Sequence, residues 1–188
     1  MRAILIRHGV TEWNLERRYL GRTDAPLCEQ GRAEAERAKK DASLRRVYVS
    51  PMKRARETAS ILFPNAEQIA VDGFREMDFG AFEGRTADEM EHDPAYRAWV
   101  DGLCVDACPD GESQVEFTAR VVAAFRETVA TADGDSVFVV HGGVIMALLA
   151  ALAQPKRAFY EWYTPNLAGF RVTVAPDGTL HDPEPVQY

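Results

Sequence analysis

The residues of this chain best suited to chemistry stand at the end of its first apolar run. Ile4 to Ile6 have strand character, and Arg7, His8 and Gly9 follow them directly. Histidine suits nucleophilic or acid–base work near neutral pH, and arginine is a natural ligand for phosphate or carboxylate. A strand that ends in such a pair places both side chains at the rim of a sheet, where α/β proteins bind ligands. Alone, so short a string is equally consistent with a surface arginine and a structural histidine.

A second histidine repeats this arrangement. Val137 to Val140 form a fully apolar run, typical of a central strand in a parallel sheet, and His141, Gly142 and Gly143 follow it. The glycines let the backbone approach a ligand closely, and a helix expected from Val144 to Ala153 presents its N-terminal amides to an anion. One histidine after a strand is more often structural, but two of them, one beside an arginine, favour a site.

A third candidate, Arg54, lies near the start of a predicted helix. Val47 to Val49 is a short apolar run, and after it Ser50 suits an N-cap and Pro51 the first helical position. The helix should end near Phe63. Arg54 should then lie over the helix N-terminus, where unpaired amides attract an anion. By itself, the surrounding charge run is more typical of a solvated surface.

Parallel strands would bring Arg7, His8, Arg54 and His141 to one rim of the sheet. Three potential cations around a neutral imidazole fit a phosphoryl group, whose transfer depends on positioning and on stabilising charge on its oxygens. His8 would attack phosphorus and carry a phosphohistidine intermediate. The leaving alkoxide needs a proton, which a carboxylic acid in the irregular segment from Phe74 to Gly84 can supply.

The elements that must position these residues predict a three-layer α/β/α sandwich with a mostly parallel central sheet. We also expect a helix from Glu29 to about Lys40, a strand from Ile69 to Val71, a helix after the capping box at Ser113 to Glu116, and a closing edge hairpin from Gly169 to His181. The helix after the capping box should bury one apolar stripe, formed by Val115, Val122, Phe125 and Val129.

Residues 1–188 are expected to form a single domain, with a small inserted lobe at about residues 79–112 over the active site. Phe82, Tyr96 and Trp99 belong to this lobe. They either shape a substrate pocket or form the lobe's own core, and both interpretations stay open.

Composition excludes several classes of protein. The chain is 46% hydrophobic and 27% charged, which is ordinary for a soluble globular protein. It has no apolar run of membrane-spanning length and no signal-peptide pattern, so a cytoplasmic location is expected. The net charge of −7 argues against nucleic-acid binding. Cys28, Cys104 and Cys108 are odd in number and lack a CxxC pair, which predicts reduced thiols rather than a disulfide framework or a metal site.

Taken together, the motifs resemble those of the histidine phosphatase superfamily, which has the phosphoglycerate mutase-like fold. The resemblance extends over residues 1 to about 150 and is specific because the motifs occur in the family's order. They are Arg7-His8-Gly9 with Thr11 and Asn14, Gly21-x-x-Asp24-x-Pro26-Leu27 with Gly31, Ser50-Pro51-x-x-Arg54-Ala55 with Glu57-Thr58-Ala59, Arg75-Glu76 with Phe79-Gly80-x-x-Glu83-Gly84, and His141-Gly142-Gly143.

The resemblance implies a small-molecule phosphomonoester as partner, with no metal and no cofactor; charge and hydropathy argue against nucleic acid and membrane as partners, and a homodimer is left open. One departure is Cys28, where relatives usually have Ser or Thr, and it puts in doubt only a local helix cap. The implied site residues are His8 as nucleophile, Glu76 as proton donor and later base, Arg7, Arg54 and His141 as phosphate ligands, and Asn14 and the backbone of Gly142 as lesser contacts.

Three functions stay open. The first is a phosphatase of a small phosphorylated metabolite. Met77-Asp78-Phe79-Gly80 and Asp110-Gly111-Glu112-Ser113, with Phe117 and Arg120, look like α-ribazole-5′-phosphate phosphatases of cobalamin synthesis, although broad-specificity relatives share these features. The second is a cofactor-dependent phosphoglycerate mutase, disfavoured because residues 78–85 lack the Tyr-Gly and Leu-Asn-Lys stretches of mutases. The third is an inactive phosphate- or partner-binding module, ranked last because every catalytic position is filled.

Overall fold

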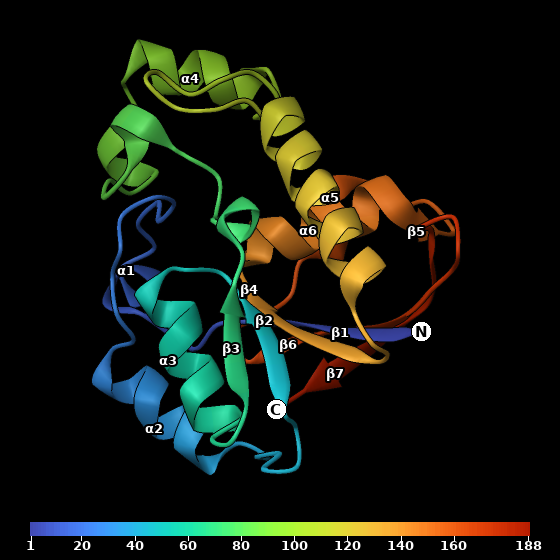
Figure 1. Ribbon diagram of the computed structural model, residues 1–188. Helices are drawn as coiled ribbons and strands as arrows, with labels where there is room; N and C mark the ends of the chain where they lie inside the picture. The colour runs from blue at the N-terminus through green and yellow to red at the C-terminus, as the bar shows by residue number, and fades with distance from the viewer.

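The computed structural model describes residues 1–188, built around one seven-strand sheet (Figure 1). Its strand order is β3-β2-β4-β1-β6-β7-β5. The four strands from β3 to β1 are parallel, whereas β6 runs antiparallel to both of its neighbours, β1 and β7. The predicted α/β class is therefore confirmed. The strands are β1 (Arg2–Arg7), β2 (Arg46–Val49), β3 (Glu67–Ala70), β4 (Ser136–Val140), β5 (Ala153–Gln154), β6 (Ala168–Val174) and β7 (Leu180–Gln187).

Helices cover both faces of the sheet, so the molecule has three layers, with the sheet in the middle (Figure 1). Alternate residues of β4 point to opposite faces: Val137 and Val139 pack with α2 and α3, and Phe138 and Val140 with α5 and α6. The helices are α1 (Glu12–Leu15), α2 (Glu29–Arg37), α3 (Lys53–Leu62), α4 (Pro94–Asp101), α5 (Gln114–Thr131) and α6 (Gly142–Leu152), with short 3₁₀ turns η1 (Asp72–Phe74), η2 (Gly80–Phe82), η3 (Asp88–Met90) and η4 (Phe159–Trp162).

Three predicted details were wrong. The helix expected to start at Ser50 and Pro51 begins at Lys53 with Met52 as its N-cap; the Ser50 hydroxyl lies 3.4 Å from the backbone N–H of Met52 and 2.7 Å from His141 Nε2. The hairpin is not at the edge of the sheet, since β7 also pairs with the two-residue strand β5, which is the edge strand. The apolar stripe on α5 is displaced: Val115 is 68% exposed, Val122 and Val129 are only partly buried, and Phe117, Val121, Phe125 and Thr128 face the core.

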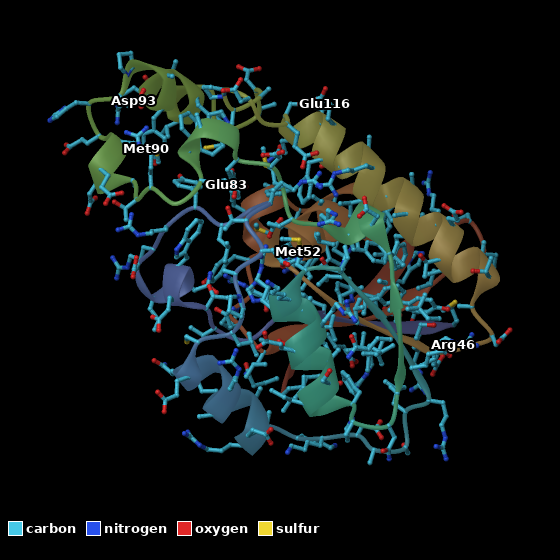
Figure 2. All side chains as sticks on the ribbon, turned by 60° about the vertical axis from the view of Figure 1, so that its left-hand side comes forward. Arg46, Met52, Glu83, Met90, Asp93 and Glu116 are labelled. Carbon is cyan, nitrogen blue, oxygen red and sulfur yellow. The ribbon has the colours of Figure 1, made fainter.

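Residues 79–112, here called the lobe, stand above the sheet and carry α4, at the top of Figure 1. Phe82, Tyr96 and Trp99 are buried there, with ring centroids 5.5 to 6.1 Å apart. Asp93, labelled with Met90 in Figure 2, caps α4 by accepting from the backbone N–H of Ala95. These aromatic rings belong to the same buried cluster as the core on the α5–α6 face of the sheet. Trp99 also lines a cavity, so the rings contribute both to the core and to a pocket wall.

The expectations about membrane spans and about the cysteines concern the whole chain. No helix combines the length and the hydrophobicity that a membrane crossing requires. The three cysteines are free thiols, and Cys28 and Cys108 are buried. Cys28 also fills the cap position that the sequence left in doubt, because its Sγ accepts from the backbone N–H of Gly31 at 3.3 Å.

Candidate active site

The two strand-end histidines and Arg54 meet at one edge of the sheet. β1 and β4 are parallel neighbours, so His8 and His141, which follow them, lie side by side with ring centroids 5.2 Å apart. Arg54 lies in the first turn of α3, which follows β2, the other neighbour of β4. Its Nε donates to His141 Nδ1 at 3.2 Å. The predicted convergence is confirmed for these side chains.

His8 has one ring nitrogen bonded and the other free for chemistry. Its Nδ1 lies 2.6 Å from the carbonyl oxygen of Gly9. A carbonyl oxygen only accepts, so Nδ1 carries the hydrogen and Nε2 keeps its lone pair. Burial lowers the pKa of His8 well below its usual value, and the positive charges of Arg54 and Arg7 lower it further. The imidazole is therefore neutral at pH 7, as a nucleophile must be.

His141 is held from both sides. Arg54 is a permanent donor, so His141 Nδ1 accepts, and Nε2–H must donate to Ser50 Oγ at 2.7 Å. Burial lowers the pKa of His141 well below its usual value, and Arg54 and His8 add to this effect. Of the three cations expected around the nucleophile, the two arginines are charged and His141 is neutral.

Arg54 is completely buried and is positioned by backbone carbonyls. Its two terminal nitrogens donate to the carbonyl oxygens of Thr23 and Gly21 at 2.9 and 2.8 Å. A guanidinium has five N–H groups, so two remain for an anion after these bonds and the bond to His141. Burial lowers the pKa of Arg54 to about 10, against the raising effect of Glu76, which still leaves it charged at neutral pH.

Arg7 offers an unused donor at the same place. Its Nη1 donates to the carbonyl oxygen of Thr164 at 2.8 Å, and its guanidinium lies 5.8 Å from the centre of the Tyr163 ring. Its Nε is buried and has no partner. A buried donor without a partner is costly, so this group is suited to an anionic ligand.

Glu76 is the carboxyl group of the site. It is 8% exposed, and its two oxygens accept from the backbone N–H groups of Met77 and Gly143, each at 2.9 Å. Burial raises the pKa of Glu76 above its ordinary value, and this effect outweighs the two hydrogen bonds and the charges of Arg54 and Arg7. A carboxyl group of this kind retains its proton at a higher pH than an exposed one, as a general acid requires.

The two glycines after His141 have different neighbours. Gly142 begins α6 and lies against Arg7, whereas a Cβ on Gly143 would lie 2.2 Å from Glu76 Oε1. The motif indicates Gly142 as a ligand contact, whereas the contact of Gly143 with Glu76 appears only in the structure. The Gly-Gly pair was the available signal, because close backbone approach requires glycine.

Two residues that the sequence analysis left without a role hold the nucleophile's backbone. Asn166 Nδ2 donates to the carbonyl oxygen of His8 at 2.8 Å and lies 3.4 Å from Asn14 Oδ1. The backbone N–H of Gly9 donates to Thr58 Oγ1 at 2.9 Å. Thr58 occurred in a family motif without a role. Asn166 lay outside the matched motifs, so only the tertiary structure identifies it.

Glu83 holds the loop that receives Arg54. Its carboxylate accepts from the backbone N–H of Arg22 and from both the backbone N–H, at 2.8 Å, and the hydroxyl of Thr23. Figure 2 shows Glu83 on the underside of the lobe, facing the N-terminal segment that passes beneath it. Because Arg54 donates to Gly21 and Thr23, Glu83 connects the lobe to the buried guanidinium.

Arg120, on α5, fixes the backbone around Glu76. Its terminal nitrogens donate to the carbonyl oxygens of Gly73, Arg75 and Glu76, each at 2.9 Å. Glu112 accepts from the same guanidinium at 2.6 Å. The carboxyl group of Glu76 is thus held at its side chain by α6 and at its backbone by α5.

A cavity of about 390 Å³ opens from this site. Arg7, Asn14, Glu76 and Gly142 line it, while His8, Arg54 and His141 are buried outside its wall. Asn14 Oδ1 accepts from the backbone N–H of Thr11, which leaves its amide nitrogen for a ligand. No group of three or more His, Cys, Asp or Glu side chains is arranged to hold a metal ion.

Comparison with known proteins identifies relatives of the whole chain. Residues 3–180 match the family model of the "Histidine phosphatase superfamily (branch 1)". The chain is 31% identical over 169 residues to "Probable phosphoglycerate mutase GpmB" of Enterobacter sp. strain 638, covering 86% of this chain and 78% of that protein. The structure of YhfR from Bacillus stearothermophilus is 31% identical, with a TM-score of 0.80 over 96% of this chain and 94% of that one.

A more distant relative shares the fold. A structure named "putative alpha-ribazole-5'-P phosphatase" from Escherichia coli superposes with a TM-score of 0.88 over 100% of this chain and 96% of that one, at 22% identity. At this identity the likeness concerns the fold alone.

Proposed function

This chain belongs to the histidine phosphatase superfamily, branch 1, and from that membership we propose that it hydrolyses phosphomonoesters through a phosphohistidine on His8. The family implies a phosphatase or a mutase that acts on a phosphorylated small molecule. The observation that carries the proposal is the pairing of a neutral His8, whose Nε2 lone pair is free, with a buried Glu76 of raised pKa at the same strand ends.

In the first step, the Nε2 lone pair of His8 attacks phosphorus. The P–O ester bond breaks and its electron pair goes to the leaving oxygen, which takes the proton of Glu76. The remaining donors of Arg7 and Arg54 stabilise the charge on the three other oxygens. His141 supports them, because its Nδ1 accepts from Arg54 Nε and so holds the guanidinium in place.

In the second step, water attacks the phosphohistidine. Glu76, now a carboxylate, accepts the proton from the water, and the P–N bond breaks with its electron pair returning to Nε2. Inorganic phosphate leaves, and both His8 and Glu76 return to their initial protonation states. Every proton taken up in one step is released in the other.

The test is release of phosphate from p-nitrophenyl phosphate and alkyl phosphates, with trapping of the phosphoenzyme. Wild-type protein should release phosphate with chelator present and form an acid-labile phosphohistidine. His8→Ala should do neither. His92→Ala is the matched control because His92 is an exposed histidine of the lobe. Turnover that survives in His8→Ala would exclude the phosphohistidine route, and silence of the wild type would favour an inactive binding module.

A phosphoglycerate mutase is the second candidate, because the relatives at 30% identity or more include proteins with that name. Residues 78–85, which lack the mutase stretches, favour hydrolysis. Interconversion of 3- and 2-phosphoglycerate, assayed in parallel with phosphate release, separates the two. The panel should also include α-ribazole 5′-phosphate, whose hydrolysis as the preferred ester would support a role in cobalamin synthesis.

A further inference from the structure

The cavity beside Glu76 is larger than a phosphoryl group requires and has a markedly apolar wall. An apolar cavity of about 150 Å³ is enough for one benzene ring, and this one measures about 390 Å³. Eleven of its eighteen lining residues are hydrophobic. Phe79 and Trp99 come from the lobe, Phe117 from α5, Met146 from α6 and Phe159 from η4.

Charged side chains line only the end of the cavity that Arg7 and Glu76 form, with one exception. The charged lining residues are Arg7, Glu76 and Arg18. Arg18 is already paired, because its guanidinium donates to the carboxylates of Glu16 and Glu89, the latter at 2.9 Å. A carboxylate on the organic part of a substrate would therefore lose water without meeting an unpaired cation, which is unfavourable.

Two exposed aromatic side chains extend the apolar wall of the cavity. Tyr160 and Tyr163 line it and are 56% and 66% exposed. Exposed apolar side chains beside a cavity are typical of ligand grooves.

We propose that the preferred substrate is the phosphate ester of an uncharged alcohol with an apolar or aromatic body at least one ring in size. This inference rests on the proposed phosphohydrolase function and specifies its substrate class. The ring would lie between the lobe and α5–α6, while the phosphoryl group occupies the end formed by Arg7 and Glu76. Phosphoglycerates, which carry a carboxylate beside the ester, are then poor substrates despite the names of the relatives.

The test compares two esters that differ only at the far end. 3-Phenylpropyl phosphate and 3-carboxypropyl phosphate both release a primary alkoxide, so their chemical steps have matched demands. Burial of the ring predicts a kcat/KM higher for the phenyl ester by at least about tenfold. Equal values, or a preference for the carboxylate, would overturn the inference while leaving the phosphatase function intact. No hydrolysis of either ester or of p-nitrophenyl phosphate would instead overturn the proposed function.

A variant pair tests the reason for the preference. Gln114 lines the cavity at the start of α5 and is partly exposed. Gln114→Lys supplies the missing cation, so the phenyl-to-carboxyl ratio of kcat/KM should fall about tenfold. Gln114→Met, similar in length but uncharged, should retain the wild-type preference. Unfolding temperatures of both variants establish that they fold. A ratio that is unchanged in folded Gln114→Lys, or that falls equally in Gln114→Met, contradicts the charge argument.

Discussion

Two features of its surroundings prepare His8 as a nucleophile: a hydrogen bond to one ring nitrogen and a lowered pKa. The Gly9 carbonyl holds the hydrogen on Nδ1, which directs the lone pair of Nε2 away from the backbone. Burial and the two arginines lower the pKa of the ring. The nucleophile is therefore both oriented and unprotonated before a substrate arrives, which reduces the reorganisation that the reaction requires.

The pH dependence of activity should reflect this pair of shifted groups. His8 has a lowered pKa, so its neutral form persists below pH 6.5 and the acid limb of kcat/KM lies below that value. Glu76 has a raised pKa, so it stays protonated above 4.5 and its deprotonation produces the alkaline limb. The measurement is a pH profile of kcat/KM on an alkyl phosphate. The alkaline limb should vanish in Glu76→Gln, whereas a limb caused by ionisation of the ester itself would remain.

Two esters with different leaving groups can distinguish a proton-donating role of Glu76 from a structural one. Glu76→Gln removes the proton donor, so kcat/KM on an alkyl phosphate should fall about 10²–10⁴-fold. p-Nitrophenolate leaves without protonation, so kcat/KM for its ester should fall far less. Steady-state kinetics on the two esters give the comparison. Equal losses on both would indicate that Glu76 acts only by holding structure around Gly143.

At the scale of elements, strand ends supply the reactive groups and loops hold them in place. β1, β2 and β4 are adjacent and parallel, so the residues that follow them emerge at one edge. The segments that fix these residues come from far along the chain. Thr164 and Asn166, which precede β6, hold Arg7 and His8, and Glu83 of the lobe holds the loop that receives Arg54.

Glu83→Ala should release that loop and misplace Arg54. Misplacement of a binding group can cost as much as about 10²-fold, and we expect kcat/KM to fall at least about tenfold. Glu83→Gln keeps one acceptor and should recover part of the activity. Glu91→Ala removes an exposed carboxylate of the same lobe and serves as control. Full activity in folded Glu83→Ala would show that Arg54 does not depend on this connection.

Gly143→Ala tests the contact between α6 and the proton donor. The added Cβ would meet Glu76 Oε1 at 2.2 Å, so the carboxyl group must move and lose its bond to the amide of residue 143. Activity on alkyl phosphates should fall more than activity on p-nitrophenyl phosphate. Gly142→Ala is the comparison, since its Cβ would lie 3.4 Å from Arg7 Nε and should not give this difference between esters. The same dependence on leaving group in both variants would contradict the assignment.

At the scale of the whole molecule, the buried histidines of the site reduce the stability of the folded protein at low pH. In the folded protein, burial keeps the pKa values of His8 and His141 below their ordinary value of 6.5. Below pH 6.5 the unfolded chain therefore binds more protons than the folded one, and stability falls as the pH falls. Glu76, whose pKa is raised above 4.5, has the opposite effect between 4.5 and its folded pKa.

Because the destabilising effect of the two histidines exceeds the opposite effect of the one carboxyl group, we expect a net loss of stability from pH 7 to pH 5. Each histidine contributes a limiting slope of about 1.4 kcal/mol per pH unit. His141→Gln removes one of them, so the decline in the free energy of unfolding over this range should become shallower. Urea unfolding at pH 7, 6 and 5 measures it. The same decline in His141→Gln and in the wild type would mean that His141 does not titrate differently in the two states.

The sequence alone determined the fold class and the position of the reactive groups. Apolar runs, the Ser113 capping box and the glycines after His141 act on the backbone beside them, so their structural consequences are local. The order of these elements then specifies a parallel sheet, and a parallel sheet brings His8, Arg54 and His141 to one edge.

Only the tertiary structure decided which distant groups complete the site. Ser50 accepts from His141, Asn166 holds the backbone of His8, and Glu83 reaches the loop under the lobe. Val115 is exposed and not in the core. Each outcome depends on which segment, dozens of residues away, fills the neighbouring space. Periodicity and capping preferences carry no information about that, because they describe contacts within one element.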